Sequence, residues 1–154
     1  MFDSFPEPPA ADRAQVAALP LMAGEDGAER VLLVTSRQTR RWVIPKGWPI
    51  KGLKPHEAAA REALEEAGVT GRAKKAPIGS YRYFKRCEGH FDYCRVDVFL
   101  LRVEKQLKTW REKGQRESRW FTFDEAADLV QEPGLVALLR DLAAKSPASL
   151  LPGR

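Results

Sequence analysis

Three glutamates with helical spacing are the chemically most informative residues of this chain. Glu62, Glu65 and Glu66 stand at positions i, i+3 and i+4 of the segment Arg61–Gly68, and a helix with this spacing carries all three side chains in one sector. Like charges at these spacings repel by roughly 0.2–0.5 kcal/mol per pair, and anions are unfavourable near the C-terminus of a helix. We therefore expect a cation to lie against this face.

A divalent metal ion would neutralise the three carboxylates of this face better than one arginine does. Arg61 can pair with Glu65 one turn further on, but that leaves two carboxylates uncompensated. Mg²⁺ prefers oxygen ligands, binds through one or two carboxylates, and keeps positions for water and for substrate phosphates. The triplet therefore predicts a metal site for a phosphorylated substrate, and a solvated acidic stripe is the alternative interpretation.

Positive charge gathers just upstream of these carboxylates. The chain has 26 Lys and Arg residues against 21 Asp and Glu residues, which gives a net charge of +5. No acidic residue occurs between Glu29 and Glu57, where the cations are Arg30, Arg37, Arg40, Arg41, Lys46, Lys51 and Lys54. This block predicts an anionic partner, although charge alone does not distinguish nucleic acid, nucleotide, polyphosphate and acidic membrane.

The elements that must position these residues can be traced along the chain. Proline at the start and glycine just after the end predict a helix over 55–67. Before this helix, the pattern favours a hairpin of strands 15–22 and 30–35, followed by an extended piece at 42–45. After the helix, it favours a second hairpin of strands 77–86 and 91–103, a strand at 119–122, and helices at 124–130 and 133–145. This order predicts an α/β (α+β) fold with a mixed sheet.

Length and composition indicate a single soluble domain. The chain has 154 residues, of which 44% are hydrophobic and 31% are charged, enough apolar material for one core. We expect the domain to span 13–145, with flexible ends at 1–12 and 146–154. The N-terminus lacks the features of a signal peptide, and the longest apolar stretch is too short for a membrane helix, so we expect a cytoplasmic protein.

Sulfur and imidazole groups are few. Cys87 and Cys94 lack the C-x-x-C spacing of a zinc or redox centre, so we expect two reduced thiols. His56 and His90 are expected to be exposed polar side chains. Trp48 and Tyr83 could stack on a nucleobase, but packing in the core is the more common role of a lone aromatic residue.

The spacing around the glutamates closely resembles the Nudix box, G-x5-E-x7-R-E-U-x-E-E-x-G-U with U aliphatic. Gly47, Arg61 and the residues 62–69 fill eight of the nine specified positions, with Ala63 counted as aliphatic. The exception is Leu53, which stands where the family has its first glutamate. The resemblance implies a Nudix-type α/β/α sandwich and metal-dependent hydrolysis of a nucleoside diphosphate linked to another moiety, or of a related pyrophosphate.

The resemblance also implies roles for individual residues. Glu62 and Glu66 correspond to the principal ligands of Mg²⁺ or Mn²⁺. Glu65 corresponds to the third carboxylate, either a ligand or the proton acceptor that activates water, and Arg61 to its orienting partner. Leu53 implies altered support of the loop before the helix. Further ligands often come from a later loop in this family, where this chain offers Glu112 and Glu117.

The segment before the box indicates the substrate class. Ser36-Arg37 and the run from Arg41 to Pro45 resemble diphosphoinositol polyphosphate phosphohydrolases, where such residues bind phosphates. By motif position this assigns substrate binding to Ser36, Arg37, Arg41, Lys46 and the loop glycine Gly47. The glycine-rich loop of that subgroup is replaced here by Lys-Gly-Trp-Pro. The expected substrate is a diphosphoinositol polyphosphate or a diadenosine polyphosphate.

Two alternatives stay open at this point. Leu53 could mark a weakened enzyme that only binds a phosphorylated ligand, although a pure binding protein has no need of three costly carboxylates. The positive surface could also serve hydrolysis of the pyrophosphate at RNA 5′ ends. Against that, the sequence shows no basic platform interleaved with aromatic residues, so we expect no other nucleic-acid binding and no membrane partner. The oligomeric state is left open.

Overall fold

The computed structural model describes residues 13–145, and the end segments 1–12 and 146–154, for which flexibility is expected, lie outside the described residues. The elements in chain order are β1 (Arg13–Ala23), β2 (Glu29–Thr35), β3 (Trp42–Val43), β4 (Lys46–Gly47), α1 (Pro55–Ala67), β5 (Val69–Ala73), β6 (Gly79–Cys87), β7 (His90–Gln106), β8 (Ser118–Phe121), α2 (Phe123–Leu129) and α3 (Pro133–Ala143). Within the described part of the chain, none of these helices is long and apolar enough to cross a membrane.

All strands join one mixed sheet, as the sequence predicts. The main path is β3-β2-β1-β7-β5, in which β1 runs parallel to β7 and antiparallel to β2. Short β4 pairs with β1, β8 pairs with β2, and β6 forms the expected hairpin with β7. The sheet thus brings β4, which carries Lys46 and Gly47, beside the first half of β1.

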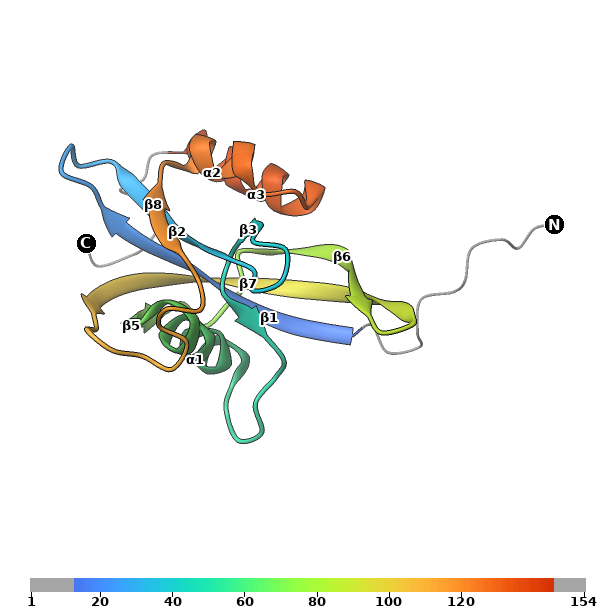
Figure 1. Ribbon diagram of the computed structural model, residues 1–154. Helices are drawn as coiled ribbons and strands as arrows, with labels where there is room; N and C mark the ends of the chain where they lie inside the picture. Colours follow the sequence, from blue (N-terminus) through green and yellow to red (C-terminus); the bar gives the residue numbers. More distant parts are fainter. Residues whose placement is uncertain (1–12, 146–154) are drawn as a thin grey trace.

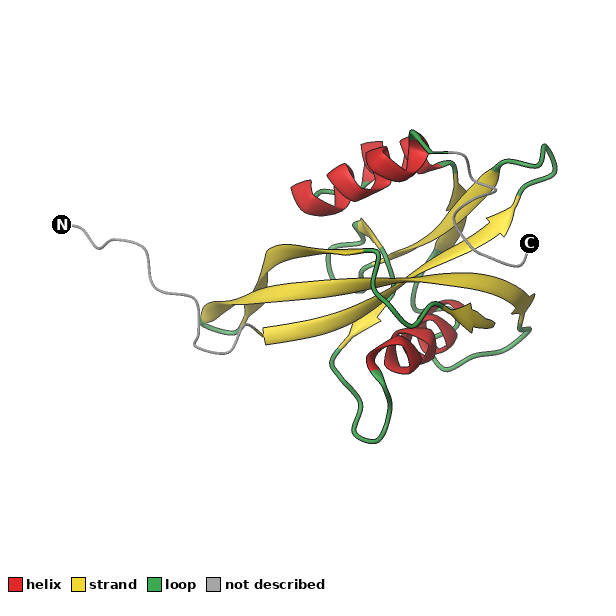
Figure 2. Cartoon of the chain, turned by 180° about the vertical axis from the view of Figure 1, so that it is seen from behind, coloured by secondary structure: helices red, strands yellow, loops and turns green. Residues whose placement is uncertain are grey.

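The sheet lies between two helical layers. Side chains alternate along β1, so Val16 and Ala18 join one core cluster while Ala17 and Leu19 join the other. The first of these clusters is covered by α1 and the second by α2 and α3, which lie on opposite faces of the sheet in both views (Figures 1 and 2). The α/β/α sandwich predicted from the sequence is therefore confirmed.

Helix α1 has the predicted bounds, and its two ends explain why. Pro55 occupies the first turn, and Gly68 follows the helix with φ 70°, a left-handed conformation that favours glycine. Beyond the helix, the Gln106 side-chain amide donates to the carbonyls of Ala67 and Gly68 at 3.2 and 3.0 Å. Four alanines of α1 are buried against the sheet, which fixes the rotation of the helix and hence the direction of its glutamates: Ala58, Ala59, Ala63 and Ala67.

Strand β5 is the main element that the sequence analysis did not predict. It is five residues long, and its register against β7 shifts between Thr70 and Gly71. A Cβ atom at Gly71 would collide with the backbone carbonyl of Arg102, so only glycine fits here. A short strand with a central glycine lacks the alternating pattern by which strands are recognised.

An ion pair between β2 and β7 is buried beside the middle strand. The Arg102 guanidinium donates twice to the Glu29 carboxylate, with the Nη1 to Oε1 distance at 3.0 Å. The Glu29 side chain is completely buried and that of Arg102 is 18% exposed. An uncompensated charge in the protein interior lowers the free energy of unfolding, so the stability of the fold depends on this pair.

We expect Arg102→Met to lower the free energy of unfolding by about 3–5 kcal/mol, because it removes the guanidinium group from beside a completely buried carboxylate. Urea denaturation measures this. The matched control is Arg72→Met, which removes an exposed pair with Glu104 and should cost less than about 1 kcal/mol. Equal costs for the two variants would show that the buried pair contributes no more than a surface pair.

Candidate active site

The glutamates of α1 stand in different environments. Glu66 is only 6% exposed, Glu62 and Glu65 are half-buried, and Arg61 is exposed. The Glu62 and Glu66 carboxyl groups lie within reach of each other, and the pKa of each is raised, by burial first. In the absence of a cation, a proton on one of the two groups relieves the repulsion between them.

The pKa values of this pair show how strongly the site needs positive charge. The pKa of Glu66 is raised to about 8, mainly by burial; the Arg116 guanidinium opposes the shift, and the hydrogen bond to Glu62 and the Glu62 charge contribute to it. Burial is also the largest cause that raises the pKa of Glu62, and the charges of Glu65 and Glu112 add to it. The nearby cations of the chain are thus insufficient to keep both carboxylates ionised at neutral pH.

Gly47 and Glu62 lie so close that any side chain at position 47 would displace the Glu62 carboxylate. A Cβ atom built on Gly47 would stand 2.5 and 2.6 Å from Oε2 and Oε1 of Glu62. Strand β4, held to β1 at Val16 and Ala17, therefore places its backbone directly over the carboxylate. The glycine of the loop is required here for space and not for an unusual backbone angle, because its φ is not positive.

The loop between β7 and β8 completes the cluster. Arg116, with a side chain only 12% exposed, donates from Nε to Glu112 Oε1 at 2.7 Å and from Nη1 to the Thr35 carbonyl at 3.1 Å. The amide of Glu112 donates to the carbonyl of Glu65 on α1 at 3.0 Å. Glu112, one of the two predicted extra ligands, thus lies by the glutamates, and Arg116 is a site residue that the sequence analysis missed.

Two predicted contacts are not found. Glu65 pairs with Arg111, with Nη1 and Oε1 3.5 Å apart, and not with Arg61 one turn before it. The exposed Arg111 reaches Glu65 because the β7–β8 loop packs on α1, which helical spacing alone does not reveal. Glu117 pairs with Arg119 and is 49% exposed at its side chain, so of the two later glutamates only Glu112 is placed beside Glu62.

The predicted phosphate-binding residues divide into two groups. In the β2–β3 loop, the Ser36 hydroxyl accepts from the Arg41 amide at 3.0 Å and so closes the loop, while Arg37 donates to Gln115, the neighbour of Arg116. Lys46 approaches the carboxylates, since the charge of Glu66 acts on its ammonium group. Arg30 does not belong to this surface, because it pairs with Asp26 in the β1–β2 turn.

Glu132 joins Arg41 and Lys46 on the other side of β4. Arg41 Nη1 lies 3.3 Å from Glu132 Oε2, whereas Glu132 Oε1 is buried with no hydrogen-bond partner in the described structure. Burial lowers the pKa of Lys46, and Glu66 and Glu132 raise it. Nothing in the sequence singles out Glu132 except its place directly before Pro133, so sequence analysis missed it.

The two aromatic residues differ in their placement. Tyr83 packs on the core and donates its hydroxyl to Gln15 Oε1 at 2.6 Å, with Lys46 Nζ 5.3 Å from its ring centroid. Trp48 is 36% exposed, and the Arg13 guanidinium lies 4.6 Å from its ring centroid. The expectation of core packing is confirmed for Tyr83. It is wrong for Trp48, which lies in the loop that follows β4.

Leu53 explains how the loop before α1 is supported without the usual glutamate. Its side chain is partly buried and packs with Ile50 against the core cluster under α1. Its amide donates to the Ile50 carbonyl at 3.0 Å, and Glu57 accepts from the Lys54 amide to cap the helix. Position 53 is thus held by apolar packing, and Glu62 and Glu66 lie together with leucine at this place.

The donor set fits a hard divalent cation. Glu62, Glu66 and Glu112 offer carboxylate oxygens, the ligands that Mg²⁺ and Mn²⁺ prefer. The raised pKa of Glu66 indicates a place where a cation can replace a proton. This is the chemical behaviour expected of a metal site.

Comparison with known proteins agrees with this geometry. The chain is 37% identical over 105 residues to "Nudix hydrolase 12, mitochondrial" of Arabidopsis thaliana, an alignment that covers 66% of this chain and 52% of that protein. It is 33% identical over 106 residues to the diphosphoinositol polyphosphate phosphohydrolase 3-alpha of Mus musculus, covering 67% and 61%. The chain therefore spans about half to three fifths of the length of the curated relatives it matches.

Solved structures show the same fold. A Caenorhabditis elegans Ap4A hydrolase superposes with a TM-score of 0.62 at 18% identity, over 87% of this chain and 98% of that one. A NUDIX hydrolase of Nitrosomonas europaea gives a TM-score of 0.64 at 20% identity, over 92% and 96%. The model of the NUDIX domain family matches residues 12–142, and the chain belongs to this family.

Proposed function

We propose that this Nudix hydrolase cleaves a pyrophosphate bond in a highly phosphorylated small molecule, of the diphosphoinositol polyphosphate or diadenosine polyphosphate type. The observation that carries the proposal is the Glu62–Glu66 pair beside Gly47, in which Glu66 is buried with its pKa raised to about 8 and Lys46 and Arg116 are nearby cations. Such a site favours a divalent cation and, through it, phosphate oxygens.

In this proposal each residue of the site has a distinct part. Glu62 and Glu66 would hold Mg²⁺ or Mn²⁺, with Glu112 of the β7–β8 loop as a further oxygen donor, and the ion would neutralise charge on the phosphates that are cleaved. Glu65 accepts a proton from the attacking water. Arg61, at the exposed edge of the same helix, orients the substrate or Glu65 by its charge.

The basic residues upstream of α1 support a substrate with several phosphates. Arg41 and Lys46 flank the carboxylates on one side, and Ser36 and Arg37 extend the surface toward the β7–β8 loop. The unpaired Oε1 of Glu132 would accept a hydrogen bond from a hydroxyl or amino group of the substrate. Two similar proteins carry names that specify such substrates, diphosphoinositol polyphosphate and Ap4A.

We expect Arg37→Ala to raise KM about tenfold or more and to change kcat less than twofold, because a hydrogen bond to a charged group contributes about 1.5–3 kcal/mol to binding. Arg37 is exposed, so the melting temperature should not change. The control is Arg119→Ala, another exposed arginine, paired with Glu117. A lower kcat at unchanged KM would contradict a binding role.

A substrate panel tests the proposal. Purified protein with Mg²⁺ is incubated with a diphosphoinositol polyphosphate, a diadenosine polyphosphate, ADP-ribose and an RNA with a 5′ triphosphate, and products are followed by phosphorus NMR. We expect the highest kcat/KM on one of the first two. Absence of turnover on both would refute the proposed substrate class, and binding without any product would favour the weakened enzyme.

One observation favours RNA 5′ ends as a second candidate substrate. The pairing of β6 with β7 places three arginines and three aromatic residues on one face of the hairpin, contrary to the expectation of no such platform: Arg82, Phe84, Arg86, Phe91, Tyr93 and Arg95. Phe84 and Phe91 are 67% and 63% exposed. Turnover of RNA that exceeds that of both small molecules and falls steeply with salt would favour this candidate.

The cellular location and the limits of the domain belong to the same proposal. We propose a cytoplasmic enzyme with its catalytic domain at 13–145. The names of several plant relatives include the word mitochondrial, so fractionation of cells that express the tagged protein is the relevant measurement. Recovery with an organelle would overturn the cytoplasmic location without affecting the proposed chemistry.

A further inference from the structure

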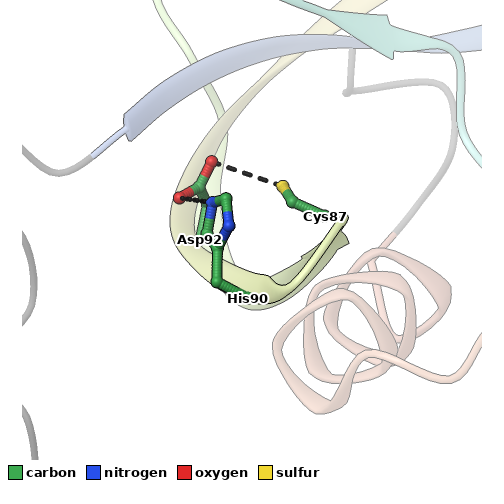
Figure 3. A group of neighbouring side chains, drawn as sticks. All are labelled: Cys87, His90 and Asp92. Atoms are coloured by element: carbon green, nitrogen blue, oxygen red, sulfur yellow. Dashed lines mark hydrogen bonds and ion pairs between the residues drawn. The ribbon is translucent and has the colours of Figure 1, made fainter.

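A second group of metal-ligand side chains lies at the far end of the β6–β7 hairpin. Cys87 ends β6 and His90 begins β7, with Glu88 and Gly89 forming the two-residue turn between them. Asp92 follows on the same face of β7, since Cys87 pairs with His90 and Lys85 with Asp92. One ligand atom from each of the three residues lies within 4.8 Å of the other two, and Figure 3 shows the side chains directed toward one another.

Two of the three distances between these ligand groups match those of a tetrahedral zinc site. Cys87 Sγ lies 3.5 Å from Asp92 Oδ2, and His90 Nε2 lies 3.3 Å from Asp92 Oδ1. Zinc bonds of about 2.3 Å to sulfur and about 2.0 Å to nitrogen and oxygen, at tetrahedral angles, separate sulfur from oxygen by about 3.5 Å and nitrogen from oxygen by about 3.3 Å. The first distance ends on Oδ2 of Asp92 and the second on Oδ1. Rotation about the last torsion of the aspartate side chain is easy, so a single oxygen can bind the metal ion.

The surroundings of His90 and Asp92 prepare both for metal binding. His90 Nδ1 lies 3.1 Å from the Glu88 carbonyl, which can only accept, so Nδ1 donates there and Nε2 is the ring nitrogen that faces Asp92. Metal-bound histidines are commonly oriented by such a bond to a backbone carbonyl. Asp92 is 18% exposed and also pairs with Arg13 at 3.2 Å, a contact that keeps its carboxylate fixed and that a metal ion must share or displace.

We propose that this hairpin turn binds Zn²⁺ through the Cys87 thiolate, His90 Nε2 and the Asp92 carboxylate, with water as the fourth ligand. Thiolate and imidazole favour zinc over magnesium, whereas the carboxylates of α1 favour magnesium, so the chain has two chemically different cation sites. Binding releases the thiol proton to solvent and involves no redox step. The proposal does not depend on the proposed substrate of the Nudix site.

Cobalt replaces zinc as a spectroscopic probe in the test. Reduced, metal-free full-length protein is titrated with Co²⁺ and then with Zn²⁺, with excess Mg²⁺ present to occupy the carboxylates of α1. We expect one equivalent of Co²⁺ to give a thiolate-to-cobalt charge-transfer band and the visible bands of a tetrahedral site, both removed by Zn²⁺. Cys87→Ser should abolish the charge-transfer band, and His90→Gln should weaken Zn²⁺ binding at least tenfold.

Two controls separate this site from other cysteines and from the Nudix site. Cys94→Ser removes a buried thiol on β7, two residues beyond Asp92, and should leave the spectrum unchanged. Glu66→Gln should also leave it unchanged. In the wild-type protein, Zn²⁺ should protect Cys87 from alkylation by iodoacetamide, a measurement that needs no variant to fold.

Three results would overturn the proposal. The first is a titration in which wild-type protein binds no Zn²⁺ at micromolar concentrations. The second is Zn²⁺ binding that Cys87→Ser and His90→Gln leave unchanged, and the third is binding that Glu66→Gln abolishes, which would place the metal at α1.

Discussion

Replacing Glu66 with glutamine is expected to lower kcat about a thousandfold and at the same time to make the metal-free protein more stable. Glutamine keeps the size of the side chain and can donate a hydrogen bond to Glu62, but it removes a charge that the proposed cation needs. A metal ion contributes several kcal/mol to stabilising charge in pyrophosphate cleavage, and each 1.4 kcal/mol corresponds to about a factor of ten in rate.

The gain in stability follows from the raised pKa of Glu66. The unfolded chain ionises this carboxyl near its ordinary value of 4.5, whereas the folded chain holds the proton until about pH 8. The free energy of unfolding therefore falls as the pH rises from 4.5 to 8 and stays low above 8. Glutamine is neutral throughout, so at pH 9 the variant should be more stable by a few kcal/mol, at about 1.4 kcal/mol per pKa unit.

Both effects are measured on the same samples. Initial rates with Mg²⁺ give kcat, and urea denaturation in the presence of a chelator at pH 5 and pH 9 gives the free energy of unfolding. Glu104→Gln, at an exposed position of β7, is the matched control and should change neither quantity appreciably. Wild-type turnover by Glu66→Gln, or a variant that is less stable than the wild type at pH 9, would contradict the placement of this carboxylate.

Gly47→Ala is expected to reduce kcat about a hundredfold without unfolding the protein. The new Cβ would stand 2.5 Å from Oε2 of Glu62, so the carboxylate must move away from the place it shares with Glu66. A displacement of about 1 Å in a catalytic group can cost a factor of about 100 in rate. Because the φ of Gly47 is not positive, alanine adds no backbone strain that would confuse the interpretation.

A double-mutant cycle shows whether Gly47 acts through Glu62. If it does, adding Gly47→Ala to Glu62→Gln should lower kcat little further, since the displaced carboxylate is already gone. Gly79→Ala, whose Cβ meets only the methyl groups of the flexible Leu138 side chain, serves as control for the change from glycine to alanine. Fully additive losses would indicate a different role for Gly47.

The sequence predicts the framework of this site because its signals are local. Pro55 and Gly68 mark the ends of α1, and the buried alanines between them set which way Glu62 and Glu66 point. The alternation of apolar residues likewise predicts β7 and its partner in the hairpin. These features depend on residues within one or two turns of each other, so spacing alone suffices.

The charged neighbours of the glutamates were not predictable in this way. Arg116 and Arg111 reach α1 because a loop some fifty residues later folds back on it, and Glu132 comes from the start of α3. The face of the β6–β7 hairpin that carries arginine and aromatic side chains could not be predicted for a related reason. Its residues come from two strands, and along each strand they alternate with residues of the opposite face. Only the pairing of the strands brings them together.

The central claim is that the carboxylates of α1 bind the metal ion that cleavage requires, and a Mn²⁺ titration followed by electron paramagnetic resonance tests it most directly. Cys87→Ser is used as background to remove the proposed zinc site. We predict one saturable Mn²⁺ site, with turnover rising at the same Mn²⁺ concentrations, and the loss of both when Glu62→Gln and Glu66→Gln are combined. Wild-type Mn²⁺ affinity or wild-type turnover in that combined variant would contradict the account.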